Sequence, residues 1–139
     1  MARRFALSDR RGVAADPAVL RACGQAWARA WGFGVAPTEE ALLRSAGGYA
    51  GLEAFLQGMG DRLASQALGE LRWHELRAAQ RFANAALKVA RLARSRGCDG
   101  REAKALLAQA EIYEARGMGG RAQSCRRRAV PSGAVPEAT

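Results

Sequence analysis

The sequence predicts an all-α protein: a single compact bundle of five or six helices, with one long basic helix and flexible termini. Alanine supplies 32 of the 139 residues, and Ala, Leu and Arg together dominate the chain. Only nine residues are β-branched, whereas strands are built mainly from β-branched and aromatic residues. Apolar residues also recur at the three- and four-residue spacings of amphipathic helices.

The composition divides the chain into three parts. Residues 1–15 form a basic N-terminal arm, residues 16–130 the helical domain, and residues 131–139 a disordered tail. No apolar run approaches the ~18 residues that a membrane span needs, and no secretory signal is visible at the start. The three cysteines are odd in number and far apart, which fits a reducing compartment. We therefore expect a cytoplasmic protein that does not enter a membrane.

The first helix is predicted to begin after Asp16, a residue type that caps helix N-termini, and to end at Gly32. Trp27 and Trp31 continue its apolar stripe. Two interpretations follow: the two rings are core anchors, or they form a stacking platform for bases. The periodicity favours core anchors.

Thr38 is predicted to cap a second, short helix that ends at Gly47 and Gly48. A third amphipathic segment follows over residues 52–63. Its glycines at 58 and 60 predict a break or kink in this segment, because glycine weakens a helix interior.

The longest helix is expected within residues 61–96, because no proline lies there and glycine is absent after Gly69 until Gly97. Gly97 is predicted to end that helix in the left-handed conformation, and Asp99 to cap the next one. A glycine-rich turn over 117–120 leads into a last short helix over 121–129. The helix after Asp99 has its predicted apolar period at Ala103, Leu106, Leu107, Ala110 and Tyr113.

The longest helix is predicted to have two contrasting faces. Ala79, Ala86 and Ala93 lie seven residues apart on one face, so a neighbouring helix can approach this small-residue seam closely. The opposite face collects Trp73, Arg77, Gln80, Arg81, Asn84, Lys88, Arg91 and Ser95.

Charge on that polar face has one sign. Between Leu76 and Cys98 there are six basic residues and no acidic residue. Arg77 and Arg81 lie four residues apart, a spacing at which like charges repel and at which helices ordinarily place an acidic partner. A stripe about 20 residues long spans ~30 Å, the length of several phosphates. Trp73, at one end, is expected to stack on a base or to pack against a partner.

This pattern predicts a non-enzymatic nucleic-acid-binding protein that contacts the phosphate backbone of DNA or RNA and acts as a small subunit of a nucleoprotein complex. The alternative is a protein–protein adaptor or regulator that docks an acidic partner surface through the basic helix. A plain solvated helix face is the third interpretation. The predicted contact residues are Trp73, Arg77, Arg81, Asn84, Lys88, Arg91, Arg94, Arg126, Arg127 and Arg128.

The sequence offers few groups for catalysis. His74 is the only histidine and is expected on the half-exposed shoulder of the long helix. Cys98 follows Arg94 and Arg96, an environment that can lower a thiol pKa, but no catalytic partner accompanies it, so Cys98 is interpreted as a loop thiol. No set of ligands has the spacing of a metal site. We expect no catalytic residue, no metal and no cofactor.

Overall fold

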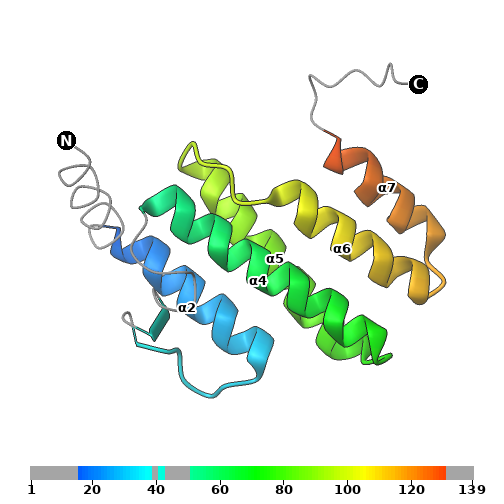
Figure 1. Ribbon diagram of the computed structural model, residues 1–139, viewed down its shortest axis with the longest axis horizontal. Helices are drawn as coiled ribbons and strands as arrows, with labels where there is room; N and C mark the ends of the chain where they lie inside the picture. Colours follow the sequence, from blue (N-terminus) through cyan, green and yellow to red (C-terminus); the bar gives the residue numbers. More distant parts are fainter. Residues whose placement is uncertain (1–15, 39–40, 43–50, 131–139) are drawn as a thin grey trace.

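The computed structural model describes residues 16–38, 41–42 and 51–130. The described residues form five helices and no strand, which confirms the all-α class (Figure 1). These helices are α2 (Pro17–Trp31), α4 (Leu52–Arg72), α5 (Leu76–Ser95), α6 (Glu102–Ala115) and α7 (Gly119–Ala129). Three predicted features lie outside the described residues: the basic arm over 1–15, the helix end at Gly47 and Gly48, and the tail over 131–139.

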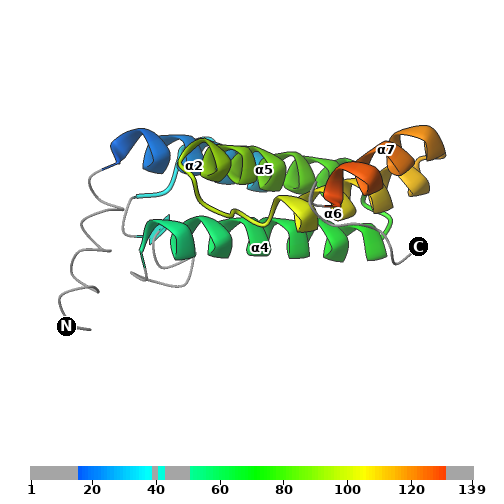
Figure 2. The same ribbon diagram turned by 90° about the horizontal axis from the view of Figure 1, so that it is seen from above.

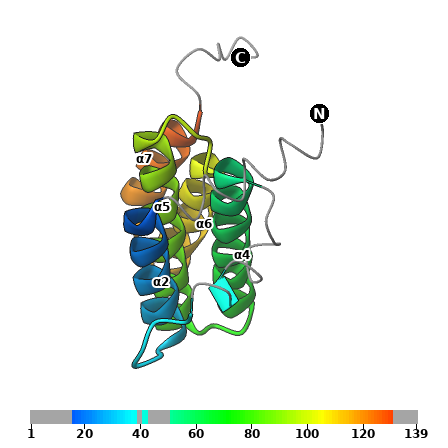
Figure 3. The same ribbon diagram turned by 90° about the vertical axis from the view of Figure 1, so that its left-hand side faces the viewer.

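Helix α5 is central to the bundle. It packs against α2, α4 and α6, whereas α7 packs mainly against α6. Helices α2, α5 and α7 lie towards one side of the molecule, and α4 lies on the other (Figure 2). The end view shows the same two sides, with α6 next to α4 (Figure 3). One strip of α5, between α2 and α6, is left exposed.

The core is built largely from small and aliphatic side chains. Ala79, Ala86 and Ala93 are fully buried on α5, as the predicted small-residue seam requires. Larger side chains fill the space between the helices. The largest fully buried ones are Phe55, Leu42, Leu56, Met59, Leu63, Leu106 and Ile112.

Two predicted N-terminal caps are confirmed. The side chain of Asp16 accepts a hydrogen bond from the backbone N–H of Val19 at 3.3 Å, so it satisfies one of the unpaired donors at the start of α2. The hydroxyl of Thr38 accepts from the N–H of Ala41 at 3.2 Å. Helix α2 ends at Gly32, whose φ of 80° is left-handed, as predicted.

The predicted break at Gly58 and Gly60 is wrong. Helix α4 runs through both residues without interruption. Gly60 is needed for a different reason: its Cα faces the backbone of Gly100 in the loop between α5 and α6, where a side chain would collide. The glycine therefore permits a close approach between a helix and a loop.

The predicted long basic helix within residues 61–96 is not confirmed. The stretch is divided into α4 and α5 by a turn at residues 73–75. The N–H of His74 donates to the carbonyl of Leu71 at 2.9 Å, and the N–H of Glu75 donates to that of Glu70 at 3.0 Å. These two bonds form a Schellman motif, in which His74 takes the left-handed position with a φ of 60°. His74 therefore lies exposed in a turn, and it is not on a helix shoulder.

Helix α6 differs from its prediction at its start and on its faces. Its N-cap residue is Arg101, while Asp99 accepts a hydrogen bond from the N–H of Arg101 at 3.0 Å. Ala103 and Leu107 are exposed, although the predicted apolar period included them. The polar side chain of Gln109 is instead buried. Helix α7 begins two residues earlier than predicted and ends at the predicted residue.

Candidate nucleic-acid interface

The exposed strip of α5 carries five of the ten predicted contact residues. The helical period of three and four residues brings them onto one side of the helix, between α2 and α6. They are Arg77, Arg81, Asn84, Lys88 and Arg91, and each is exposed to solvent. Because α5 ends in the left-handed residue Gly97, as predicted, the strip stops where the loop to α6 begins.

Three adjoining grooves border this strip. The first lies between α2 and α5, where Arg29 joins Arg81 and Lys88. The second lies at the start of α5, where Arg116 from the end of α6 joins Arg77 and Arg81. The third runs between α5 and α7 over side chains of α6, and is lined by Arg91, Arg121 and Arg128. Asn84 lines all three grooves.

We call this surface the basic face. No acidic side chain lines any of the three grooves among the described residues. Helices α2, α5 and α7 and the end of α6 contribute its eight cations, so it is wider than a single helix. They are Arg29, Arg77, Arg81, Lys88, Arg91, Arg116, Arg121 and Arg128.

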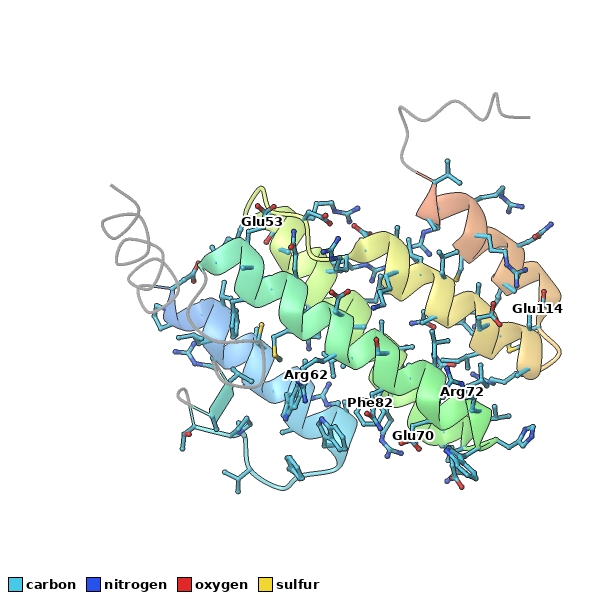
Figure 4. All side chains as sticks on the ribbon, in the orientation of Figure 1. Glu53, Arg62, Glu70, Arg72, Phe82 and Glu114 are labelled. Carbon is cyan, nitrogen blue, oxygen red and sulfur yellow. The ribbon has the colours of Figure 1, made fainter. Side chains whose placement is uncertain are left out.

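Five of the nine described cations outside the basic face lie within 4.0 Å of a carboxylate, namely Arg94, Arg96, Arg101, Lys104 and Arg126. Arg96 bonds Asp16 at 3.0 Å, and Lys104 bonds Asp61 at 3.2 Å. Acidic side chains such as Glu53, Glu70 and Glu114 lie on α4 and at the end of α6 (Figure 4). None of the eight cations of the basic face lies within 4.0 Å of a carboxylate of the described residues. This segregation leaves a concentrated positive potential on the basic face.

Four of the predicted contact residues do not join the basic face. Arg94 forms an ion pair with Glu102 at 3.1 Å, and Arg126 forms one with Glu114 at 2.9 Å. Arg127 is exposed on α7 but lines none of the three grooves. Trp73 is 79% exposed in the turn before α5, so it is not part of the helical stripe.

Three cations of the basic face were absent from the predicted set. Arg121 belongs to an arginine-rich C-terminal segment, which was a usable signal. Arg29 and Arg116 join the face only because α2 and the end of α6 pack beside α5. That packing has no counterpart in the local sequence pattern around either residue.

A network of side-chain amides lies under the centre of the basic face. Gln80 donates through Nε2 to Oε1 of Gln109 at 2.8 Å and to Oδ1 of Asn84 at 3.0 Å. Gln109 donates to the same Asn84 oxygen at 2.9 Å. Arg116 donates to Oε1 of Gln80 at 2.9 Å. Gln109 is only 4% exposed, and these bonds satisfy its buried polar atoms.

An aromatic cluster lies beside the basic face at the end of α2. Trp27 is buried, so the core-anchor interpretation is right for that ring. Trp31 is 40% exposed: its ring meets Phe82 edge to face at 4.9 Å and stacks on Phe33 at 6.4 Å. Nε of Arg81 donates to the carbonyl of Ala30 at 3.3 Å, which joins this end of α2 to α5. Trp31 is therefore both a core and a surface residue.

Cys98 lies in the loop between α5 and α6, as predicted, and its surroundings do not lower its pKa. Partial burial and the carboxylate of Glu53 both raise the pKa of this thiol. Burial also raises the pKa of Cys23 to about 12, so its thiol stays protonated at neutral pH. No group of three His, Cys, Asp or Glu residues that could hold a metal ion occurs within residues 16–38, 41–42 and 51–130. Over the same residues, no helix has the length and apolar character to cross a membrane.

Comparison with protein-family models, curated proteins and solved structures finds no match to this chain. What the basic face offers chemically is a set of hydrogen-bond donors: guanidinium groups, one ammonium group and the amide of Asn84. Such a set binds anions, and arginine in particular matches the geometry of phosphate oxygens.

Proposed function

We propose that this protein binds DNA or RNA through the phosphate backbone, without catalysing a reaction, as a small subunit of a cytoplasmic nucleoprotein complex. The observation that supports the proposal is the basic face: eight cations line three adjoining grooves that hold no acidic side chain among the described residues. Arginine, lysine and asparagine are among the side chains that donate to phosphate oxygens in such complexes.

The dimensions of the basic face suit a polymer better than a single small anion. From Arg77 to Arg91 the strip on α5 spans about 21 Å, at 1.5 Å per residue. Duplex DNA carries one charge per ~1.7 Å of its axis, so this path passes several phosphates. Arg29 on one side and Arg121 and Arg128 on the other broaden the contact.

The salt dependence of binding tests the proposal. Affinity for a fluorescent 20-nucleotide single strand and for a 20-base-pair duplex is measured by anisotropy over a range of salt concentrations. The logarithm of affinity should fall with log salt by roughly 0.7 to 0.9 per phosphate neutralised, whatever the base sequence. The double variant Lys88→Glu, Arg91→Glu should bind more weakly, with a flatter slope. Neither side chain makes a hydrogen bond with another described residue, so the fold should be retained.

A matched charge reversal on α4 provides the control. Arg62 and Arg72 are exposed on α4, outside the basic face, and both are labelled in Figure 4. The variant Arg62→Glu, Arg72→Glu changes the net charge by the same amount, so it should reduce affinity much less. If Lys88→Glu, Arg91→Glu binds as tightly as the wild type, the basic face is a solvated surface. Equal losses in both double variants would show that only net charge matters.

An adaptor that docks an acidic protein is the second candidate. The exposed aromatic rings of Trp31, Phe33 and Trp73 favour it, because protein interfaces are enriched in aromatic residues and arginine. An adaptor should show no measurable affinity for either nucleic acid at physiological salt. The Lys88→Glu, Arg91→Glu variant should then lose an acidic protein partner that the wild type retains in a pull-down.

A further inference from the structure

The amide network under the basic face has a fixed direction, and Arg116 sets it. A guanidinium group only donates hydrogen bonds. The group that faces Nη1 of Arg116 at 2.9 Å must therefore be the oxygen of the Gln80 amide. The nitrogen of Gln80 is then turned to the other side, towards Gln109 and Asn84.

The same reasoning fixes the next two amides. Gln109 and Asn84 must each present an oxygen to the Gln80 nitrogen, at 2.8 Å and 3.0 Å. The nitrogen of Gln109 is then placed to donate to Asn84 at 2.9 Å. The Asn84 oxygen thus accepts two hydrogen bonds, both from groups held in the interface between α5 and α6. Inverting the Asn84 amide would set its NH₂ group against two other donors.

The nitrogen of Asn84 is left at the outer end of this network. It has no acceptor among the described residues, and Asn84 is exposed where the three grooves meet. We infer that Asn84 presents its side-chain NH₂ group as a pre-oriented donor to a phosphodiester oxygen at the centre of the basic face. This inference rests on the proposed function, and it adds a directional contact to the charge attraction of the surrounding cations.

Pre-orientation is what distinguishes Asn84 from those cations. A long arginine or lysine side chain loses rotamer freedom when it binds, whereas the Asn84 amide is already held by two hydrogen bonds. The buried position of Gln109 supports the network from below. A donor held in this way is expected to fix where a phosphate sits on the face.

The isosteric substitution Asn84→Asp tests the inference. Its carboxylate can still accept from Gln80 and Gln109, so the fold and melting temperature should be retained, but it can no longer donate outwards. The control is Ser95→Asp, which makes the same change in charge on an exposed residue of α5 outside the network. Affinity for the 20-nucleotide single strand should fall about tenfold further in Asn84→Asp than in Ser95→Asp.

Nuclear magnetic resonance of the side-chain amides gives an independent readout. The pair of NH₂ signals that is missing from Asn84→Asp identifies Asn84 in the wild type. Titration with the 20-nucleotide strand should shift this pair more than the pairs of Gln80 and Gln109. Equal affinities of Asn84→Asp and Ser95→Asp, or an unmoved Asn84 pair, would overturn the inference while the proposed function stood. If the wild type binds neither the 20-nucleotide strand nor the 20-base-pair duplex, the proposed function itself is overturned.

Discussion

Gly60 of α4 faces the backbone carbonyl of Gly100 so closely that a Cβ atom on Gly60 would lie 2.5 Å from the carbonyl oxygen. Gly100 is itself packed against α5, where its own Cβ would lie 2.6 Å from that of Ala93. The loop between α5 and α6 is therefore held between two helices at a distance that only glycine allows. This contact fixes where α6 begins along the axis of α5. It therefore also fixes the position of the third groove of the basic face.

Replacing Gly60 with alanine should destabilise the protein. Real Cβ atoms do not approach a backbone oxygen so closely, so the loop must shift, at a cost of about 1–3 kcal/mol. Gly69 is the control, because it lies in the same helix with no atom within 4 Å of its added Cβ. Gly69→Ala should stabilise by roughly 0.5–1 kcal/mol. Urea unfolding followed by circular dichroism measures both; a stabilised Gly60→Ala would show that the loop adapts freely.

Replacing His74 with glycine should stabilise the protein by about 1 kcal/mol. His74 has a φ of 60°, a conformation that costs a residue with a side chain roughly 1–2 kcal/mol and glycine almost nothing. The reciprocal variant is Gly97→Ala, at a φ of 74° in the equivalent position of α5, which should destabilise by a similar amount. The melting temperature should rise in His74→Gly and fall in Gly97→Ala, as thermal unfolding will measure. A destabilised His74→Gly would mean that the imidazole makes a contact worth more than the strain.

These two helix ends show why part of the fold was predictable. Helix α5 ends in a Schellman motif at Gly97, with Cys98 donating to the carbonyl of Ala93 at 2.9 Å. Glycine at that position is a visible signal, and the helix end was predicted from it. Helix α4 ends in the same hydrogen-bond pattern, but its left-handed residue is His74. Sequence pattern alone gave no sign of that end, so the later part of α4 and the whole of α5 were predicted as one helix within residues 61–96.

The candidate site was also predictable only in part. Arg77, Arg81 and Lys88 were predicted to share a surface because their spacing follows the period of one helix. Arg29 and Arg116 come from other helices, and their distance from α5 depends on how the helices pack. The direction of the Asn84 amide likewise depends on a partner outside its own helix. Relations within one helix can be predicted from the period, whereas relations between helices need the structure.

The ion pair between Asp16 and Arg96 should make stability depend on pH. Arg96 donates to both carboxylate oxygens, at 3.0 Å and 3.3 Å, and ties the start of α2 to the end of α5. The hydrogen bond from Arg96 is the main cause that lowers the pKa of Asp16 below its usual value. A lowered pKa in the folded state means that the pair stabilises fully above about pH 4 and is lost as the pH falls through the folded value.

Asp16→Asn isolates this contribution, because asparagine still caps α2 through Val19. The variant should be slightly less stable than the wild type at pH 7, since the pair is on the surface. The difference should shrink as the pH falls below 4. Urea unfolding at pH 7, 5 and 3 measures the difference in the free energy of unfolding. Arg96→Met should lower this free energy by the same amount, and the double variant Asp16→Asn, Arg96→Met should be no less stable than either single variant. A difference that is constant with pH would show that the ion pair contributes nothing.

Arg81 and Lys88 should contribute equally to nucleic-acid binding and unequally to stability. Both are exposed cations of the basic face. Arg81→Gln and Lys88→Gln should therefore each reduce the slope of log affinity against log salt by about 0.7 to 0.9, which is the contribution of one phosphate. Nε of Arg81 also donates to the carbonyl of Ala30 at 3.3 Å, near the end of α2, where a positive charge is favoured by the helix dipole.

Arg81→Gln should therefore lower the free energy of unfolding by about 1 kcal/mol, whereas Lys88→Gln, which loses no hydrogen bond to the described residues, should leave it unchanged. Titration in a low- and a high-salt buffer measures the first quantity, and urea unfolding without nucleic acid measures the second. If the two variants have equal salt slopes but unequal free energies of unfolding, binding by the basic face is separate from the role of Arg81 in joining α2 to α5. If Arg81→Gln alters stability but leaves the salt slope at the wild-type value, Arg81 belongs to the fold and the phosphate path runs along Lys88 and Arg91 without it.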